Sequence, residues 1–179
     1  HLSVHDREGG LVRQLTTGEW MVEELVHLDE NAGVVYYMSS EGDYLQRHLH
    51  RVALDGSAPP ERLTSRSGVH GSVRGGGMAV AHDHSAFVDQ CSAADTPVAT
   101  SLCPLPPLSS LPQSTASDAA EDAVLPLFDA AQADARVSSM STVLRPPRFV
   151  TLPSTDGMVT LQAALYDPDV SRFGPGPHP

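Results

Sequence analysis

Short runs of alternating apolar and polar residues, separated by turn signals, dominate the first third of the chain. Residues 24–28 alternate, residues 34–38 are β-branched and aromatic, and residues 46–54 alternate again. The Asn-Ala-Gly run at 31–33 and the Asp-Gly pair at 55–56 are typical of turns. Several short strands inside about 48 residues are the content of one four-stranded β-propeller blade. This pattern therefore predicts an all-β chain.

A short motif recurs and supports the propeller interpretation. Residues 13–17 read Arg-Gln-Leu-Thr-Thr, and residues 61–65 read Glu-Arg-Leu-Thr-Ser, about 48 residues later. Each copy is followed by a glycine, Gly18 and Gly68. A fixed spacing of this size is the sequence signature of a repeat architecture.

Two further strand pairs are expected downstream. Residues 80–90 and 98–105 form one pair, joined by a turn over 92–97, in which Pro97 ends the pairing on its own side. Residues 149–152 and 160–166 form the second pair, because an Asp-Gly turn lies between them.

Two segments lack any alternation. Residues 71–77 are glycine-rich and are interpreted as a loose connection. Residues 104–123 are dominated by Pro, Ser and Ala, which predicts a low-complexity surface insertion without regular structure.

Composition excludes two classes of function. With 11 basic and 22 acidic residues, the net charge is −11, so a nucleic-acid-binding surface is not expected. No apolar run approaches the length of about 18 residues that a membrane helix needs, so no spanning segment is predicted in this chain.

The residues that could hold a metal or cofactor are interpreted as structural. Zinc requires three or four converging ligands, and the spacing of the candidates does not supply them, so the histidines are expected on an exposed strand face. The two cysteines are expected to be reduced and partly buried, and Gly75–77 lacks the Lys-Ser/Thr end of a phosphate loop. No metal and no cofactor are therefore expected. The candidates considered are His48, His50, His82, His84, Cys91 and Cys103.

The order of these features resembles the dipeptidyl peptidase IV-like members of the prolyl oligopeptidase family of serine peptidases. The first half resembles a late propeller blade followed by the next strand pair, and the C-terminal part resembles the hairpin that enters the α/β-hydrolase domain, as in plant-type members. The segments that carry the resemblance are residues 14–22, 34–39, 48–52, 87–89, 92–97, 156–168 and 173–175. Val98 departs from the family, where a second Pro is common, and the insertion after Pro104 has no counterpart.

This resemblance implies a partial β-propeller leading into the first hairpin of a hydrolase domain. Residues 1–147 would be the C-terminal part of the propeller, with the insertion at 104–123, and residues 148–179 would begin the peptidase domain. The parent would release N-terminal dipeptides with Pro or Ala next to the cut, by a serine nucleophile with histidine as base. Its partner would be a peptide substrate, and it would be a cytoplasmic homodimer.

No catalytic residue is expected in this chain itself. None of its serines lies in the Gly-x-Ser-x-Gly context of the nucleophile elbow, so the chain alone is expected to be inactive. The Glu23-Glu24 pair is not the substrate-binding glutamate pair of the family, which lies in a different motif upstream. It is interpreted as solvent-facing, at a strand edge. The residues Asp156, Asp167 and Asp169 are assigned to turns and caps.

Two alternatives stay open. A non-enzymatic propeller that serves as an interaction scaffold would have the same blade pattern, because one fold hosts many functions. An acylaminoacyl peptidase or oligopeptidase relative within the same superfamily would also share it.

Overall fold

The computed structural model describes residues 1–71, 78–107, 124–140 and 145–176. The chain divides into two compact units. The first comprises His1–Ala93 with Val98–Asp129, and the second comprises Ala94–Pro97 with Ala130–Pro179. The expected Gly75–77 connection and residues 108–123 of the expected insertion lie outside the described residues.

A four-stranded antiparallel sheet forms the centre of the first unit. The strands run in the order β3-β4-β5-β6, which is also their order along the chain, as in a propeller blade. The first three confirm the expected strands at 24–28, 34–38 and 46–54. The strands are β3 (Val22–Asp29), β4 (Val34–Ser39), β5 (His48–Ala53) and β6 (Glu61–Arg62).

The two central strands are buried on both faces. Every residue of β4 and β5 is buried, and their register pairs Tyr37 with His50 and Met38 with Leu49. Successive side chains point to opposite faces, so Met38 and Leu49 enter one hydrophobic core, whereas Tyr37 enters the other. Burying a large apolar side chain contributes about 1.5–3 kcal/mol, so these strands anchor the unit.

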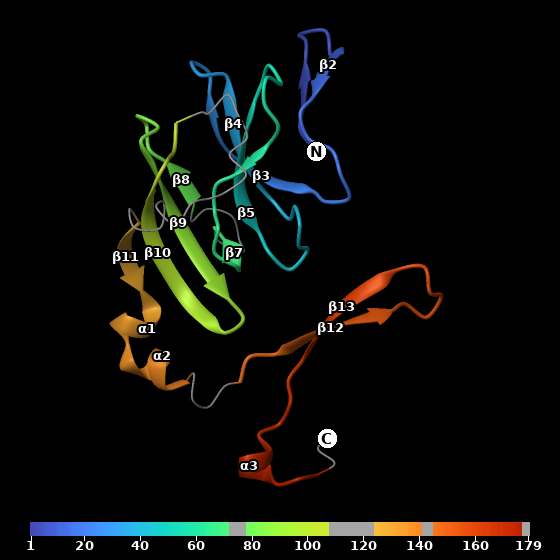
Figure 1. Cartoon of the computed structure of the whole chain (residues 1–179), viewed down its shortest axis with the longest axis vertical. Coiled ribbons are helices and arrows are strands. Elements are labelled where there is room, and N and C mark those ends of the chain that lie inside the picture. The colour runs from blue at the N-terminus through green and yellow to red at the C-terminus, as the bar shows by residue number, and fades with distance from the viewer. Residues whose placement is uncertain (72–77, 108–123, 141–144, 177–179) are drawn as a thin grey trace. The chain divides into compact units, whose positions relative to one another are not determined.

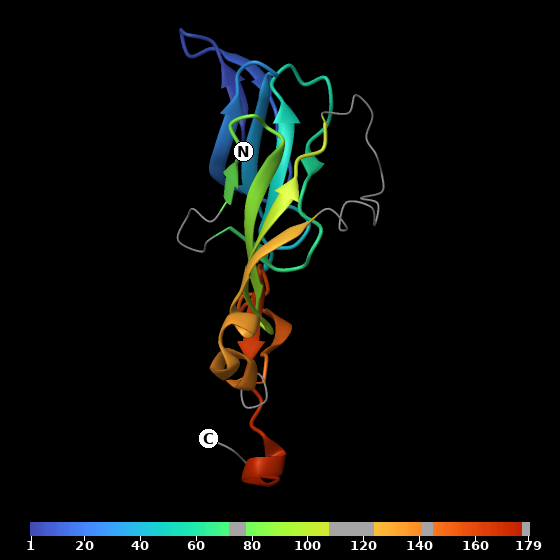
Figure 2. The ribbon, with the colours of Figure 1, turned by 90° about the vertical axis from the view of Figure 1, so that its left-hand side faces the viewer.

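A second sheet packs against the first across a shared core (Figures 1 and 2). It contains β7 (Val69–His70), β8 (Met78–Val80), β9 (Ala86–Ala93), β10 (Thr96–Pro104) and β11 (Leu125–Asp129). Both β7 and β8 pair antiparallel with β9, on the edge opposite β10. Together β7 and β8 occupy the position of one outer strand, so the strands of this sheet, like those of the first, follow their order along the chain.

The turn within this second sheet is tighter than expected. One strand was expected over residues 80–90 and a turn over 92–97, but a turn at 81–85 separates β8 from β9, β9 continues to Ala93, and β10 begins at Thr96. Pro97 therefore lies inside a strand. Leu105, at the start of the expected insertion, is buried in the core that also contains Met78 and Phe87.

The N-terminal hairpin repeats the end of the first sheet in atomic detail. It pairs β1 (Ser3–His5) with β2 (Leu11–Gln14), two strands that were not expected from the pattern. The Thr16 hydroxyl accepts a hydrogen bond from the Leu2 backbone N–H at 2.8 Å and lies 3.3 Å from the Nδ1 of His1. The backbone N–H of Leu15 donates to the carbonyl of Leu2 at 2.9 Å.

The same contacts recur about 48 residues later. The Thr64 hydroxyl accepts from the Leu49 backbone N–H at 3.2 Å and lies 3.0 Å from the Nδ1 of His48, and Leu63 N–H donates to Leu49 O at 2.8 Å. We call this arrangement the histidine–threonine corner. Its two copies, at His1/Thr16 and His48/Thr64, show that the sequence repeat is a structural repeat.

The glycine after each corner has the same unusual backbone. Gly18 has a φ of 139° and Gly68 a φ of 138°, a region that side chains other than hydrogen rarely allow. In each copy the residue two positions further on places its ring against the corner histidine. The His1–Trp20 and His48–His70 ring centroids are both 4.9 Å apart.

The second unit contains a separate hairpin. β12 (Arg148–Pro153) pairs with β13 (Thr160–Leu165) in an unbroken register, and the turn uses Gly157 at a φ of 69°, as the sequence predicts. Three short helices, which the pattern did not predict, complete the unit: α1 (Ala130–Ala133), α2 (Ala135–Met140) and α3 (Val170–Phe173). Within the described ranges, no helix is long and apolar enough to cross a membrane.

Candidate functional site

A buried cluster of ionisable residues lies where the two sheets of the first unit meet. His70 of β7 and Asp89 of β9 form its centre, with the Nδ1 of His70 2.8 Å from the Oδ2 of Asp89. The Nε2 of His70 lies 2.8 Å from the carbonyl oxygen of Arg66. His70 is 1% exposed and Asp89 is 7% exposed, so this pair is shielded from water.

The pair holds a buried positive charge. Burial by itself would lower the pKa of His70, but the hydrogen bond and charge of Asp89, with help from Cys91 and the Arg66 carbonyl, raise that pKa to about 9. His70 is therefore an imidazolium at neutral pH, and Asp89 is its counter-ion. A buried charge that is both paired and hydrogen-bonded satisfies the requirement for burying it.

Cys91 completes a set of residue types found in nucleophilic catalysis. Its sulfur lies 3.8 Å from the Nε2 of His70, so a thiol, an imidazole and a carboxylate follow one another. A nucleophile must reach its substrate, and Cys91 is only 3% exposed. The arrangement can therefore stabilise the junction between β7 and β9, but the thiol has no access to a substrate.

Both cysteines are free, as expected from the sequence, and they lie on adjacent strands of the second sheet. Cys91 is buried and Cys103 is half-buried. Burial raises the pKa of the Cys103 thiol to about 11. Cys103 is thus a protonated and unreactive thiol at neutral pH.

The expectation that His48 and His50 lie on an exposed strand face is wrong. They are 1% and 2% exposed, because β5 is a central strand that is covered on both faces. Burial lowers the pKa of His48 to about 3 and that of His50 to about 4. Both are neutral rings. His50 stacks on Tyr37 with ring centroids 5.5 Å apart, and its Nδ1 lies 3.1 Å from the Ser39 hydroxyl.

The Glu23-Glu24 pair is engaged by an arginine. A bulge in β3 brings both carboxylates to Arg47, at 3.3 Å from its Nε for Glu23 and 2.7 Å from its Nη2 for Glu24. The Arg47 side chain is 10% exposed, and the two glutamates are about one-third exposed. The interpretation of this pair as merely solvent-facing is therefore incomplete, because it is the acidic half of an ion-pair network.

Asp156 and Asp169 have the turn and cap roles that were expected, whereas Asp167 faces an arginine instead. Asp156 accepts from the backbone N–H of Met158 at 3.0 Å within the hairpin turn. Asp169 caps α3 by accepting from the Ser171 N–H at 3.0 Å, and it pairs with Arg145 at 2.9 Å. Asp167 lies 3.5 Å from Arg148, across the base of the hairpin.

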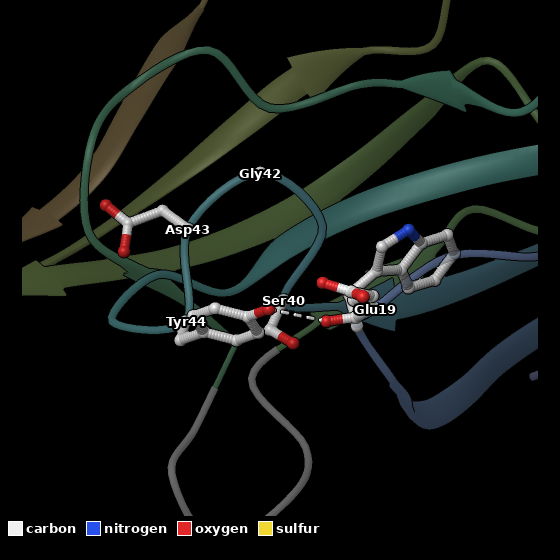
Figure 3. A pocket seen from close by; sticks show the side chains of 6 residues that line it. Glu19, Ser40, Gly42, Asp43 and Tyr44 are labelled. Carbon is white, nitrogen blue, oxygen red and sulfur yellow. Dashed lines mark hydrogen bonds between the residues drawn. The ribbon is translucent and has the colours of Figure 1, made fainter. Parts of the chain in front are cut away.

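A small pocket opens beside the loop after β4 (Figure 3). Its volume is about 150 Å³, below the range of about 300–1,000 Å³ that is usual for ligand pockets. The Tyr44 hydroxyl donates to the Glu19 carbonyl at 2.7 Å across it, as the dashed line in Figure 3 marks. The lining residues are Glu19, Trp20, Ser40, Gly42, Asp43 and Tyr44. Such a pocket can hold solvent or one end of a side chain, but not a peptide.

His82 and His84 do not form a pair of ligands with each other. His82 is exposed, whereas His84 contacts Asp29 and His27 of β3, a contact that no local spacing indicates. Within the ranges that the structure describes, no group of three or more His, Cys, Asp or Glu residues converges as a metal site.

Comparison with known proteins identifies the family of this chain. Residues 1–98 match the family described as "Dipeptidyl peptidase IV (DPP IV) N-terminal region". This match covers more than half of the chain, and it spans the N-terminal hairpin, the first sheet and part of the second. The chain therefore belongs to the dipeptidyl peptidase IV N-terminal region family.

Two particular relatives agree with this assignment. A curated "Probable dipeptidyl peptidase 4" from Emericella nidulans is 38% identical over 53 residues, which are 30% of this chain and 7% of that protein. The crystal structure of Porphyromonas gingivalis dipeptidyl peptidase 4 superposes with a TM-score of 0.67 at 20% identity. That match covers 92% of this chain and 20% of the solved one, so the chain spans a small part of the length of its relatives.

Proposed function

We propose that this chain is the propeller and linker portion of a serine-type dipeptidyl peptidase that releases N-terminal dipeptides with Pro or Ala next to the cut. The match of residues 1–98 to the family carries the proposal, and the repeated histidine–threonine corner supports it. Residues 1–147 would belong to the propeller, which restricts access to the active site. Residues 148–179 would begin the hydrolase domain.

In this proposal the chain contributes architecture and no catalytic group. The residues that most resemble a catalytic set are His70, Asp89 and Cys91. They are buried at a strand junction, where they hold the second sheet together. The nucleophile, its histidine base and the oxyanion donors would be supplied by residues beyond this chain. Peptides would be the substrate of the whole enzyme, which we propose to be a cytoplasmic homodimer.

Sequencing of the parent transcript tests this proposal. About 250 codons downstream of Pro179 should encode a tyrosine-bearing strand, a Gly-x-Ser-x-Gly elbow, and then an Asp and a His in that order. A stop codon directly after Pro179 in the mature message would contradict the proposal.

The alternative is a scaffold that binds other proteins without catalysis. It stays open because one fold hosts many functions. A scaffold would show the same blades with no elbow motif in the remainder of its message, so the same sequencing separates the two functions.

A further inference from the structure

Two histidines that are far apart in sequence meet at the surface of the first unit. His27 lies on β3, and His84 lies in the turn between β8 and β9, 57 residues later. Their Nε2 atoms are 2.9 Å apart, and their ring centroids are 5.1 Å apart at an interplanar angle of 43°. The pair thus bridges the two sheets with its nitrogen atoms directed at each other.

A buried carboxylate fixes the orientation of the second ring. The Oδ2 of Asp29 lies 3.1 Å from the Nδ1 of His84, and the side chain of Asp29 is 8% exposed. A carboxylate only accepts hydrogen bonds, so this Nδ1 carries a proton, and the lone pair of the neutral ring is on Nε2. The Oδ1 of Asp29 is held in turn by the backbone N–H groups of Asn31 and Ala32, at 3.0 and 2.9 Å.

The backbone at His84 is strained in a way that serves this contact. His84 has a φ of 54°, and it is the one residue other than glycine with a positive φ among those the structure describes. Such conformations are unfavourable for residues other than glycine and cluster at sites where geometry has a function. The strained turn presents the imidazole to β3.

We propose that His27 and His84 bind a divalent transition metal, of the Zn²⁺, Ni²⁺ or Cu²⁺ class, through their Nε2 atoms. The one proton that lies between the two nitrogens, on the Nε2 of His27, would be exchanged through solvent to the Nδ1 of that ring, which leaves a lone pair on each Nε2 for the metal. With metal–nitrogen bonds of about 2.0–2.1 Å, neighbouring ligands lie about 2.9 Å apart at a right angle and about 3.3 Å apart at a tetrahedral angle. The observed 2.9 Å separation lies within this range, and the 5.1 Å between ring centroids shows that the two nitrogens now point at each other, so a turn of the His27 ring, without movement of the strands, would direct both lone pairs at one metal.

Asp29 acts on this site through His84 and not as a ligand. A carboxylate on the distal nitrogen of a metal-binding imidazole is the usual means of orienting the ring and raising its basicity. The remaining coordination positions face solvent, because the His84 side chain is 27% exposed, and water would occupy them. With two protein ligands, the site is weaker than a closed structural zinc site.

Titration of the tag-free chain with NiCl₂ and ZnCl₂, followed by calorimetry, tests the proposal. We expect one site in the wild-type chain, and an affinity at least about tenfold lower in His27→Gln and in His84→Gln. Asp29→Asn should weaken binding about 10- to 100-fold, as for other carboxylates that hydrogen-bond to a metal-binding imidazole. MgCl₂ should give no binding, because imidazole does not suit a hard cation.

The matched control is His5→Gln, which removes an exposed histidine from the N-terminal hairpin. It should bind both metals as the wild type does. If His5→Gln weakens binding as much as His84→Gln, or if the wild type binds no metal, the proposal is wrong.

A measurement on the wild-type chain decides the matter even if a variant fails to fold. Imidazole ¹⁵N spectra recorded with and without ZnCl₂ should show the Nε2 resonances of two histidines moving together, at one equivalent of metal. Movement of a single histidine, or no movement at one equivalent of metal, would overturn the assignment.

Discussion

At the scale of single residues, the buried histidines of this chain differ in charge because they differ in the groups that they contact. His70 lies 2.8 Å from the buried carboxylate of Asp89 and remains protonated. His48 contacts the Thr64 hydroxyl and remains neutral. His50 contacts the Ser39 hydroxyl, with the partly exposed Glu41 carboxylate 3.5 Å away, and it also remains neutral. His48 and His70 are in ring contact, at 4.9 Å between centroids, so one of each kind lies side by side. Burial is common to all three, and the close hydrogen bond to a buried carboxylate sets His70 apart.

This separation predicts a maximum in stability near pH 6.5. The pKa of His70 is raised to about 9, above an unfolded value of about 6.5, so its contribution is complete below pH 6.5 and is lost as the pH rises through 9. The pKa values of His48 and His50 are lowered to about 3 and 4, so their contributions are present above pH 6.5 and are lost as the pH falls toward 4. Thermal unfolding midpoints measured from pH 4 to 9.5 should be highest near pH 6.5 and should decrease toward both lower and higher pH.

His70→Gln provides the control for this profile. In this variant the unfolding midpoint should no longer decrease above pH 6.5. Its decrease below pH 6.5, which is due to His48 and His50, should remain. A midpoint that rises steadily through pH 9 in the wild type would contradict the assigned charges.

Asp89, the counter-ion of His70, should contribute measurably to the free energy of unfolding. Asp89→Asn keeps the size of the side chain but removes the charge, so we expect a loss of about 1–3 kcal/mol in the free energy of unfolding, as for a hydrogen bond to a charged group. Denaturant unfolding at pH 6.5 measures it. The exposed Glu30→Gln is the matched control and should stay within about 0.5 kcal/mol of the wild type. Equal effects of the two substitutions would show that the buried pair contributes nothing.

At the scale of elements, the histidine–threonine corner joins the last two strand segments of a blade through one side-chain oxygen. Thr64 accepts from the Leu49 N–H and contacts His48, which ties the segment after β6 to the start of β5. The corner at Thr16 does the same for β1 and β2. Since both copies use the same atoms, the corner belongs to the repeat and not to one local sequence.

Removing the oxygen of the corner should therefore be costly, and restoring it should rescue the fold. Thr64→Val keeps the shape of the side chain but leaves the Leu49 N–H without its side-chain acceptor, which costs about 1–3 kcal/mol. Thr64→Ser keeps the oxygen and should lose much less. Denaturant unfolding of the two variants compares them, and a Val variant as stable as the Ser variant would refute the role of the corner.

The glycine that follows each corner should tolerate no side chain. Gly68 has a φ of 138°, and an added Cβ would lie 2.6 Å from the Ser92 carbonyl oxygen. Gly33, at a φ of 64° with open space around it, is the matched control. We expect Gly68→Ala to lower the unfolding free energy by at least about 1 kcal/mol more than Gly33→Ala. Equal losses would indicate that β7 and β9 adjust easily at this point.

The sequence predicted the elements whose pattern is local. Strands β3, β4, β5, β12 and β13 were expected near their observed positions, because alternation and Asp-Gly turns are local signals. The strands β6 and β7 have two residues each, too short for a period to show, and β11 follows a segment that has no alternation. The exposure of His48 was misjudged, since alternation does not reveal that a second sheet covers a strand. The contact of His27 with His84 depends on the pairing of sheets and could not be predicted from spacing.

At the scale of the whole molecule, the chain belongs to the N-terminal region of the dipeptidyl peptidase IV family and covers a small part of its relatives. Its sheets are held together by a hydrophobic core and by buried polar contacts. Within the described residues, the ionisable groups that lie close to one another are engaged with each other and not with a binding cavity. Under the proposed function, this chain would contribute structure to a dipeptidyl peptidase, and residues outside it would supply the catalytic groups.

The initial rate of Gly-Pro-p-nitroanilide hydrolysis tests this central claim most directly, when it is compared between the complete gene product and residues 1–179 alone at equal concentration. The account predicts hydrolysis by the complete product and a rate equal to the buffer blank for residues 1–179. A rate that increases in proportion to the concentration of residues 1–179, or a complete product without activity, would contradict it.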